Sequence, residues 1–130
     1  GPDCFAAVPE PETGTPGGAT HLCLSDDRFK GTVSWRDFAG NVGLGRVVPV
    51  GSNDSGLFWF FASENWEMLV KVLDGCGVND HYWVFAAATT NVEYALTVTD
   101  TESGAWWSHT NPLGTSSPAI TDTGAFAACP

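Results

Sequence analysis

Basic residues are scarce in this chain. Its 130 residues include five Lys and Arg against 15 Asp and Glu, which gives a formal net charge of −10. A field of that sign repels phosphate backbones and anionic lipid surfaces. We therefore expect neither nucleic acid nor a membrane surface as a partner.

Long hydrophobic runs and amphipathic helices are also missing. No stretch approaches the roughly 20 apolar residues of a membrane-spanning helix. Without a helical pattern of roughly 10 residues, parallel α/β architectures are excluded. Apolar residues still make up 43% of the chain and six of them are tryptophans, so we expect one packed globular domain.

Cysteine occurs four times, with no CxxC pair and no histidine at metal-ligand spacing, so a zinc site is not expected. Of the three possible disulfide connectivities we favour Cys4–Cys23 with Cys76–Cys129. The first would close the Pro-rich entry segment and the second would pin the C-terminal tail. This interpretation predicts an oxidising compartment, such as the cell exterior or cell surface. Four buried free thiols in a cytosolic protein are the alternative.

The chain divides into two parts by composition. Residues 1–20 are rich in proline and glycine, which predicts an extended N-terminal segment or surface loop. Its opening pair, Gly1-Pro2, reads as a protease-cleavage scar, and a secreted protein would already have lost its signal peptide. Residues 21–130 are predicted to form a single β-sandwich domain whose C-terminal tail is tied down by Cys129.

Two short apolar bursts, Leu57–Phe61 and Tyr82–Ala86, precede a strictly alternating stretch, Val92–Thr99. Short aromatic and β-branched segments bounded by turn residues are typical of strands in a packed sandwich. We predict an all-β fold, an immunoglobulin-like antiparallel sandwich of about seven or eight strands. Glu64–Glu67 could form one helical turn. The expected strands are 22–24, 28–36, 46–51, 56–62, 68–74, 81–88, 92–100 and 105–110, followed by an irregular tail.

Strand alternation also predicts a core, because every second side chain of a strand shares a face. Between Arg28 and Arg36 the odd-numbered positions should point inward, and Lys30, Thr32 and Ser34 should point outward. The expected core residues are Phe29, Val33, Trp35, Trp59, Trp83, Val92, Tyr94, Leu96 and Val98.

Five motifs occur in a recognisable order. They are Trp35–Asn41, Asp54–Phe61, Val70–Gly75, His81–Phe85 and Thr97–Thr101. Together they resemble a module that many exported proteins of environmental bacteria carry, often near the C-terminus, and the resemblance runs from about Cys23 to Cys129. It implies an exported, β-rich and non-catalytic accessory module.

The chain departs from that pattern between Gly104 and Pro112, where the family usually has a charged or polar strand. Here Trp106 and Trp107 are adjacent, so in a strand they must face opposite sides. One of them should therefore be exposed, and an exposed planar ring can stack on the apolar face of a sugar. We expect Trp106, Trp107 and His109 to include the ligand-binding residues. The alternative is that one tryptophan is core and the other caps a loop.

An enzyme is not expected. His21, His81 and His109 are scattered, and no serine lies in a GxSxG motif. A structural Ca²⁺ is left as an alternative, because hard oxygen ligands occur in predicted turns at Asp26-Asp27, Asn53-Asp54, Asp74 with Asn79-Asp80, and Asp122. Turn chemistry is sufficient to explain most of these residues, and no cofactor is expected.

The sequence thus favours an extracellular accessory module that binds a neutral polysaccharide or an extracellular protein. A structural spacer that self-associates through sheet edges is the second hypothesis. Presentation of an inhibitory loop to a protease is the third.

Overall fold

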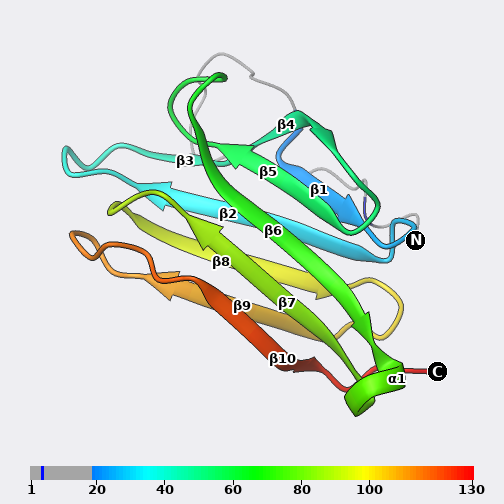
Figure 1. The fold of residues 1–130 in the computed structure, drawn as a ribbon. Coiled ribbons are helices and arrows are strands. Elements are labelled where there is room, and N and C mark those ends of the chain that lie inside the picture. The colour runs from blue at the N-terminus through cyan, green and yellow to red at the C-terminus, as the bar shows by residue number, and fades with distance from the viewer. Residues whose placement is uncertain (1–3, 5–18) are drawn as a thin grey trace.

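The computed structural model describes residue 4 and residues 19–130, and these residues form two antiparallel sheets packed face to face (Figure 1). The extended N-terminal segment expected at residues 1–20 lies mostly outside the described residues. The first sheet, sheet A, contains β1 (His21–Leu24), β2 (Phe29–Arg36), β3 (Val42–Leu44), β8 (Glu93–Asp100) and β9 (Trp106–Asn111). The second sheet, sheet B, contains β4 (Arg46–Gly51), β5 (Ser55–Trp59), β6 (Trp66–Gly75), β7 (His81–Ala88) and β10 (Ile120–Phe126).

The strand order is β1-β2-β8-β9 in sheet A, with β3 also paired to β2, and β10-β7-β6-β5-β4 in sheet B. The chain changes sheet three times: after β3, after β7 and after β9. The antiparallel sandwich predicted from the sequence is confirmed. Among the described residues, no helix is long and apolar enough to cross a membrane.

The core lies between the two sheets and takes side chains from both. The alternation predicted for the Val92–Val98 segment is confirmed, because Val92, Tyr94, Leu96 and Val98 are all buried. Phe29 and Val33 of β2 are also buried, as expected. From sheet B the core receives Phe58, Met68, Val70, Val72 and Val84.

The core prediction is wrong for Trp59 and Trp83 and is met only in part by Trp35. Trp35 is half-buried and packs on the core, with its ring 4.8 Å from that of Phe61. Trp59 and Trp83 are also half-buried and lie on the outer face of sheet B, because their neighbours Phe58 and Val84 take the inward positions.

All eight expected strands are present, and the structure adds β3 and β10. The tail expected to be irregular thus contains an edge strand paired with β7. The expected helical turn at Glu64–Glu67 is wrong, since β6 already begins at Trp66. A short helix, α1, forms at Cys76–Asn79 instead.

Two disulfides join Cys4 to Cys23 and Cys76 to Cys129, the pairing favoured from the sequence. The described residues include no free cysteine. The second bond holds the C-terminal tail against α1, and Figure 1 shows this end of the chain beside that helix.

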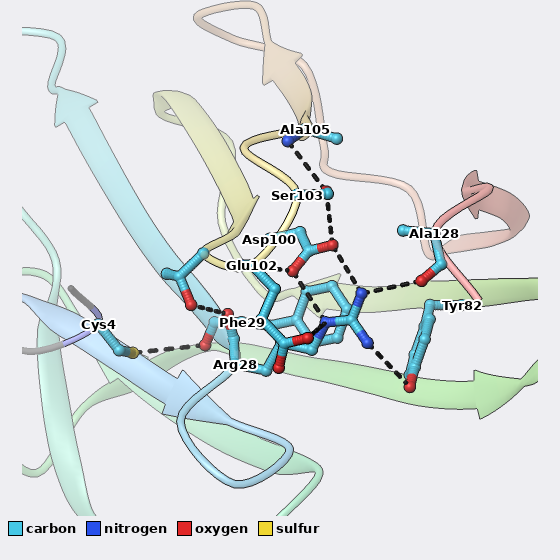
Figure 2. A network of polar contacts seen from close by, with 10 residues as sticks. Cys4, Arg28, Phe29, Tyr82, Asp100, Glu102, Ser103, Ala105 and Ala128 are labelled. Atoms are coloured by element: carbon cyan, nitrogen blue, oxygen red, sulfur yellow. Dashed lines mark hydrogen bonds and ion pairs between the residues drawn. The ribbon is translucent and has the colours of Figure 1, made fainter. Parts of the chain in front are cut away.

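A polar network also holds the tail (Figure 2). Arg28 donates two hydrogen bonds of 2.9 Å to the carboxylate of Asp100, and a third of 2.9 Å to the carbonyl of Ala128. The hydroxyl of Ser103 donates to Asp100 as well, at 2.6 Å. Burial alone would raise the pKa of Asp100, but the bonds from Arg28 and Ser103 outweigh burial and hold this pKa at about 2.

Candidate functional site

Strand β9 separates the three residues expected to bind a ligand. Its side chains alternate, so that Trp106, Ser108 and Thr110 are exposed on the outer face of sheet A. Trp107 and His109 lie on the opposite side and are half-buried. The three residues therefore do not form one site.

Trp107 closes the edge of the sandwich. Its ring packs against the core, and its indole Nε1 donates a 2.8 Å hydrogen bond to Asp122 of β10. This bond joins sheet A to sheet B. The arrangement gives Trp107 a role in holding the two sheets together.

His109 also points inward. Its ring centroid lies 6.0 Å from that of Tyr94, and its Nε2 atom is buried without a hydrogen bond to any described residue. The ring is therefore directed away from the surface that carries Trp106.

Trp106 is 68% exposed. The strand register places it beside Thr99 of β8, and Thr99 in turn lies beside Lys30 of β2. A row of indole, hydroxyl and ammonium groups thus crosses three strands of sheet A.

Hydroxyl groups dominate the rest of this surface, which we call the hydroxyl face. Thr97 pairs with both Ser108 and Thr32, and the next row joins Ser34 to Ala95 and Ala95 to Thr110. The hydroxyl face comprises Thr32, Ser34, Thr97, Thr99, Trp106, Ser108 and Thr110.

A charged pair bounds the hydroxyl face at the end remote from Trp106. Arg36 donates hydrogen bonds of 2.9 and 3.1 Å to the carboxylate of Glu93. These bonds raise the pKa of Arg36 and lower the pKa of Glu93. A shallow pocket of about 250 Å³ lies beside the pair, lined by Ser34 and Thr110 among others.

A second hollow, of about 540 Å³, is lined in part by Glu67. This residue belongs to the segment for which the sequence suggested a helical turn. Glu67 is 6% exposed, and its carboxylate accepts one 2.7 Å hydrogen bond from Asn65. Burial raises the pKa of this carboxyl. A glycoside hydrolase requires two carboxyl groups, and the described lining of this hollow supplies only one.

The turn carboxylates considered for Ca²⁺ bond to nearby backbone and side-chain groups. Asp74 accepts from the N–H of Cys76, Asp54 from the hydroxyls of Ser52 and Ser55, and Asp122 from Gly124 and Trp107. In the described part of the chain, no group of three or more His, Cys, Asp or Glu residues could hold a metal ion.

The sequence alone named Trp106, Trp107 and His109 without showing which indole is exposed, and strand alternation predicted that Thr32, Ser34, Thr97 and Thr99 point outward. The pairing of β8 with both β2 and β9, which assembles these residues into one surface, required the structure. No protein family, curated protein or solved structure matches this chain.

Proposed function

We propose that this protein is a non-catalytic, exported binding module that holds a neutral glycan on the hydroxyl face of sheet A. The observation that carries the proposal is Trp106, which is 68% exposed on the outer face of sheet A among hydroxyl side chains. An aromatic ring can stack on the apolar face of a sugar. The surrounding threonines and serines can donate and accept hydrogen bonds with sugar hydroxyls.

The chemistry of the surface favours a neutral ligand. The chain carries a net charge of −10, which opposes binding of an acidic polymer. On the hydroxyl face itself, the charges of Arg36 and Glu93 are paired with each other. The ammonium group of Lys30 lies in the Trp106 row and can donate hydrogen bonds to sugar hydroxyls. Recognition would therefore rely on hydrogen bonding and stacking.

Two disulfides support an extracellular or cell-surface location, because such bonds persist in oxidising compartments. A soluble module of this kind would keep a larger exported protein close to an extracellular polysaccharide. Trp106 would act as the anchor residue.

The proposal is tested by co-sedimentation with insoluble neutral polysaccharides, such as cellulose, chitin and xylan. We expect the protein to bind at least one of them. Trp106→Ala should weaken binding at least fivefold, the effect of losing an aromatic anchor worth about 1 kcal/mol or more. Trp66→Ala is the matched control, since Trp66 is 50% exposed on the other sheet and should bind as the parent does.

Both variants should keep the parent's melting temperature, because both rings are exposed. If the parent binds none of the polymers, or Trp106→Ala binds as tightly as the parent, glycan binding by this surface is wrong. The structural-spacer hypothesis would then replace it.

A further inference from the structure

The outer face of sheet B differs in chemistry from the hydroxyl face. On its strands β5, β6 and β7, the outward positions are mainly apolar. The register aligns Leu57, Leu69 and Ala87 in one row, and it pairs Leu73 with Trp83 and Trp59 with Trp66 in others. We call this surface the apolar face; it comprises Leu57, Trp59, Trp66, Leu69, Lys71, Leu73, Trp83, Phe85 and Ala87.

Part of the apolar face is held rigidly. The indole of Trp83 lies against Gly75, where an added Cβ atom would come within 2.2 Å of the ring. Its Nε1 donates a 2.8 Å hydrogen bond to Asn79. The ring of Phe85 is within 13° of parallel to that of Trp83, at a centroid distance of 6.0 Å. A surface fixed in this way loses little side-chain entropy when a partner binds.

Positively and negatively charged side chains are unevenly distributed on this face. Lys71 lies at an outward position of the central strand, with its ammonium group 5.8 Å from the centroid of the Phe85 ring. Within β5, β6 and β7 the only carboxylates belong to Glu67 and Asp74. Glu67 is buried, and Asp74 accepts a hydrogen bond from the N–H of Cys76. In a chain with three acids for each base, β5, β6 and β7 therefore present the cation Lys71 at their outward positions, and Arg46 of β4 is the register partner of Trp59. Asp74 is exposed at the end of β6, at a position whose partner Tyr82 packs on the core.

We infer that the apolar face docks a second, different protein whose contact surface is apolar and carries a carboxylate opposite Lys71. A groove of about 210 Å³ beside Lys71 offers a place for that group, with a lining that includes Leu69, Phe85, Ile120 and Thr121. The carboxylate would meet the ammonium of Lys71, while apolar side chains would cover the leucines and aromatic rings. This inference does not depend on the glycan proposal, because it concerns the opposite sheet.

Two other occupants fit less well. A second copy would bring its own Lys71 toward the first, on the central strand of each sheet, and would join two molecules of charge −10. A glycan would need hydrogen-bonding groups, but the indole N–H groups of Trp83 and Trp66 already bond to Asn79 and to the carbonyl of Ser63.

The size of the face suits a small, transient interface. Three strands about 4.8 Å apart, with eight residues of β6 at about 3.4 Å each, give an area of roughly 400 Å². A standard stable interface takes about 800 Å² from each partner. We therefore expect a weak complex that forms and dissociates readily.

The test uses a phage-displayed library of random dodecapeptides, selected on the intact immobilised protein. Enriched peptides are synthesised, and their dissociation constants are measured by fluorescence anisotropy. We expect enriched sequences to combine aromatic or leucine residues with Asp or Glu. Lys71→Glu and Leu69→Ser should each weaken binding at least tenfold. Lys30→Glu, a cation reversal on sheet A, is the matched control and should leave binding unchanged.

Circular dichroism melting checks that the variants stay folded, as expected for substitutions at outward positions. The inference is overturned if no peptide is enriched, if the peptides favour Lys and Arg, or if Lys71→Glu binds them as tightly as the parent. Sedimentation analysis tests whether the protein self-associates through this face. A dimer that dissociates in the Leu69→Ser variant would assign the face to a second copy and would also overturn the inference.

Discussion

Arg28 and Arg36 form similar ion pairs, but burial changes how much each pair contributes to stability. Each arginine donates two hydrogen bonds of about 3 Å to one carboxylate. The Asp100 side chain is fully buried and that of Arg28 is 14% exposed, whereas Arg36 and Glu93 are 44% and 38% exposed. Loss of one partner leaves an uncompensated charge only in the buried pair.

We therefore predict that Arg28→Ala lowers the free energy of unfolding by about 3 to 5 kcal/mol, since Asp100 would remain buried without its cation. Arg36→Ala should leave the unfolding midpoint nearly unchanged, because water solvates Glu93. Urea denaturation followed by tryptophan fluorescence compares the two variants. Equal losses in both would contradict the structural account of the Arg28 network.

The same network predicts a loss of stability in acid. The pKa of Asp100 is about 2 in the folded protein, against an ordinary value of 3.8. A lowered folded-state pKa stabilises the protein fully above the unfolded value, and the contribution disappears as the pH falls from about 4 to 2. We expect this group to account for up to about 2 kcal/mol of the loss.

Urea titrations at a series of pH values measure that loss, with Asp100→Asn as the comparison. The variant should be less stable than the parent at pH 7, and the difference should shrink below pH 4. A constant difference across the whole range would show that Asp100 is not the titrating group.

Among the elements, β9 and β10 depend on one side-chain bond between the sheets. The Trp107–Asp122 hydrogen bond lies at the edge where β10 enters sheet B. β10 has an irregular register with β7 between Asp122 and Phe126, so its backbone pairing is incomplete. Side-chain contacts must therefore supply part of its stability.

We predict that Trp107→Phe and Asp122→Ala each lower the free energy of unfolding, and that the double variant loses less than the sum. The coupling energy should be about 0.5 to 1.5 kcal/mol, the usual range for one hydrogen bond. A double-mutant cycle by urea denaturation measures it. Trp106→Phe serves as the control, and strict additivity at Trp107 and Asp122 would rule out the bond.

The elements also show where sequence reasoning succeeds. In Val92–Val98 apolar residues alternate with polar or small ones, and this pattern gave the correct strand phase. Phe58, Trp59 and Phe60 are all aromatic, as are Tyr82, Trp83 and Phe85. Because both faces of these strands are apolar, alternation carries no signal there, and Trp59 and Trp83 were assigned to the wrong face. β10 was missed because its Thr, Asp and Gly residues resemble a loop.

At the scale of the whole molecule, the two outer faces divide the surface by chemistry. Sheet A presents hydroxyl groups around one exposed indole, and sheet B presents leucines and aromatic rings around one ammonium group. Strand alternation showed that Trp106 and Trp107 face opposite sides, but the structure was needed to show that Trp106 is the exposed one. Neither face could be assembled from the sequence, since cross-strand neighbours depend on registers that join residues as distant as Lys30 and Thr99.

The two disulfides, finally, decide which part of the chain carries mechanical load. Tension applied between Gly1 and Pro130 passes from Cys4 to Cys23, follows the backbone to Cys76, and crosses to Cys129. Strands β7 to β10 lie between Cys76 and Cys129 and are shielded from the pull. Reduction of the Cys76–Cys129 bond would release a loop of sequence separation 53. That loop would add about 180 Å of extension at about 3.4 Å per residue. Single-molecule stretching of the parent and of Cys76→Ser should differ by this length, because only in the variant does the pull reach strands β7 to β10 directly.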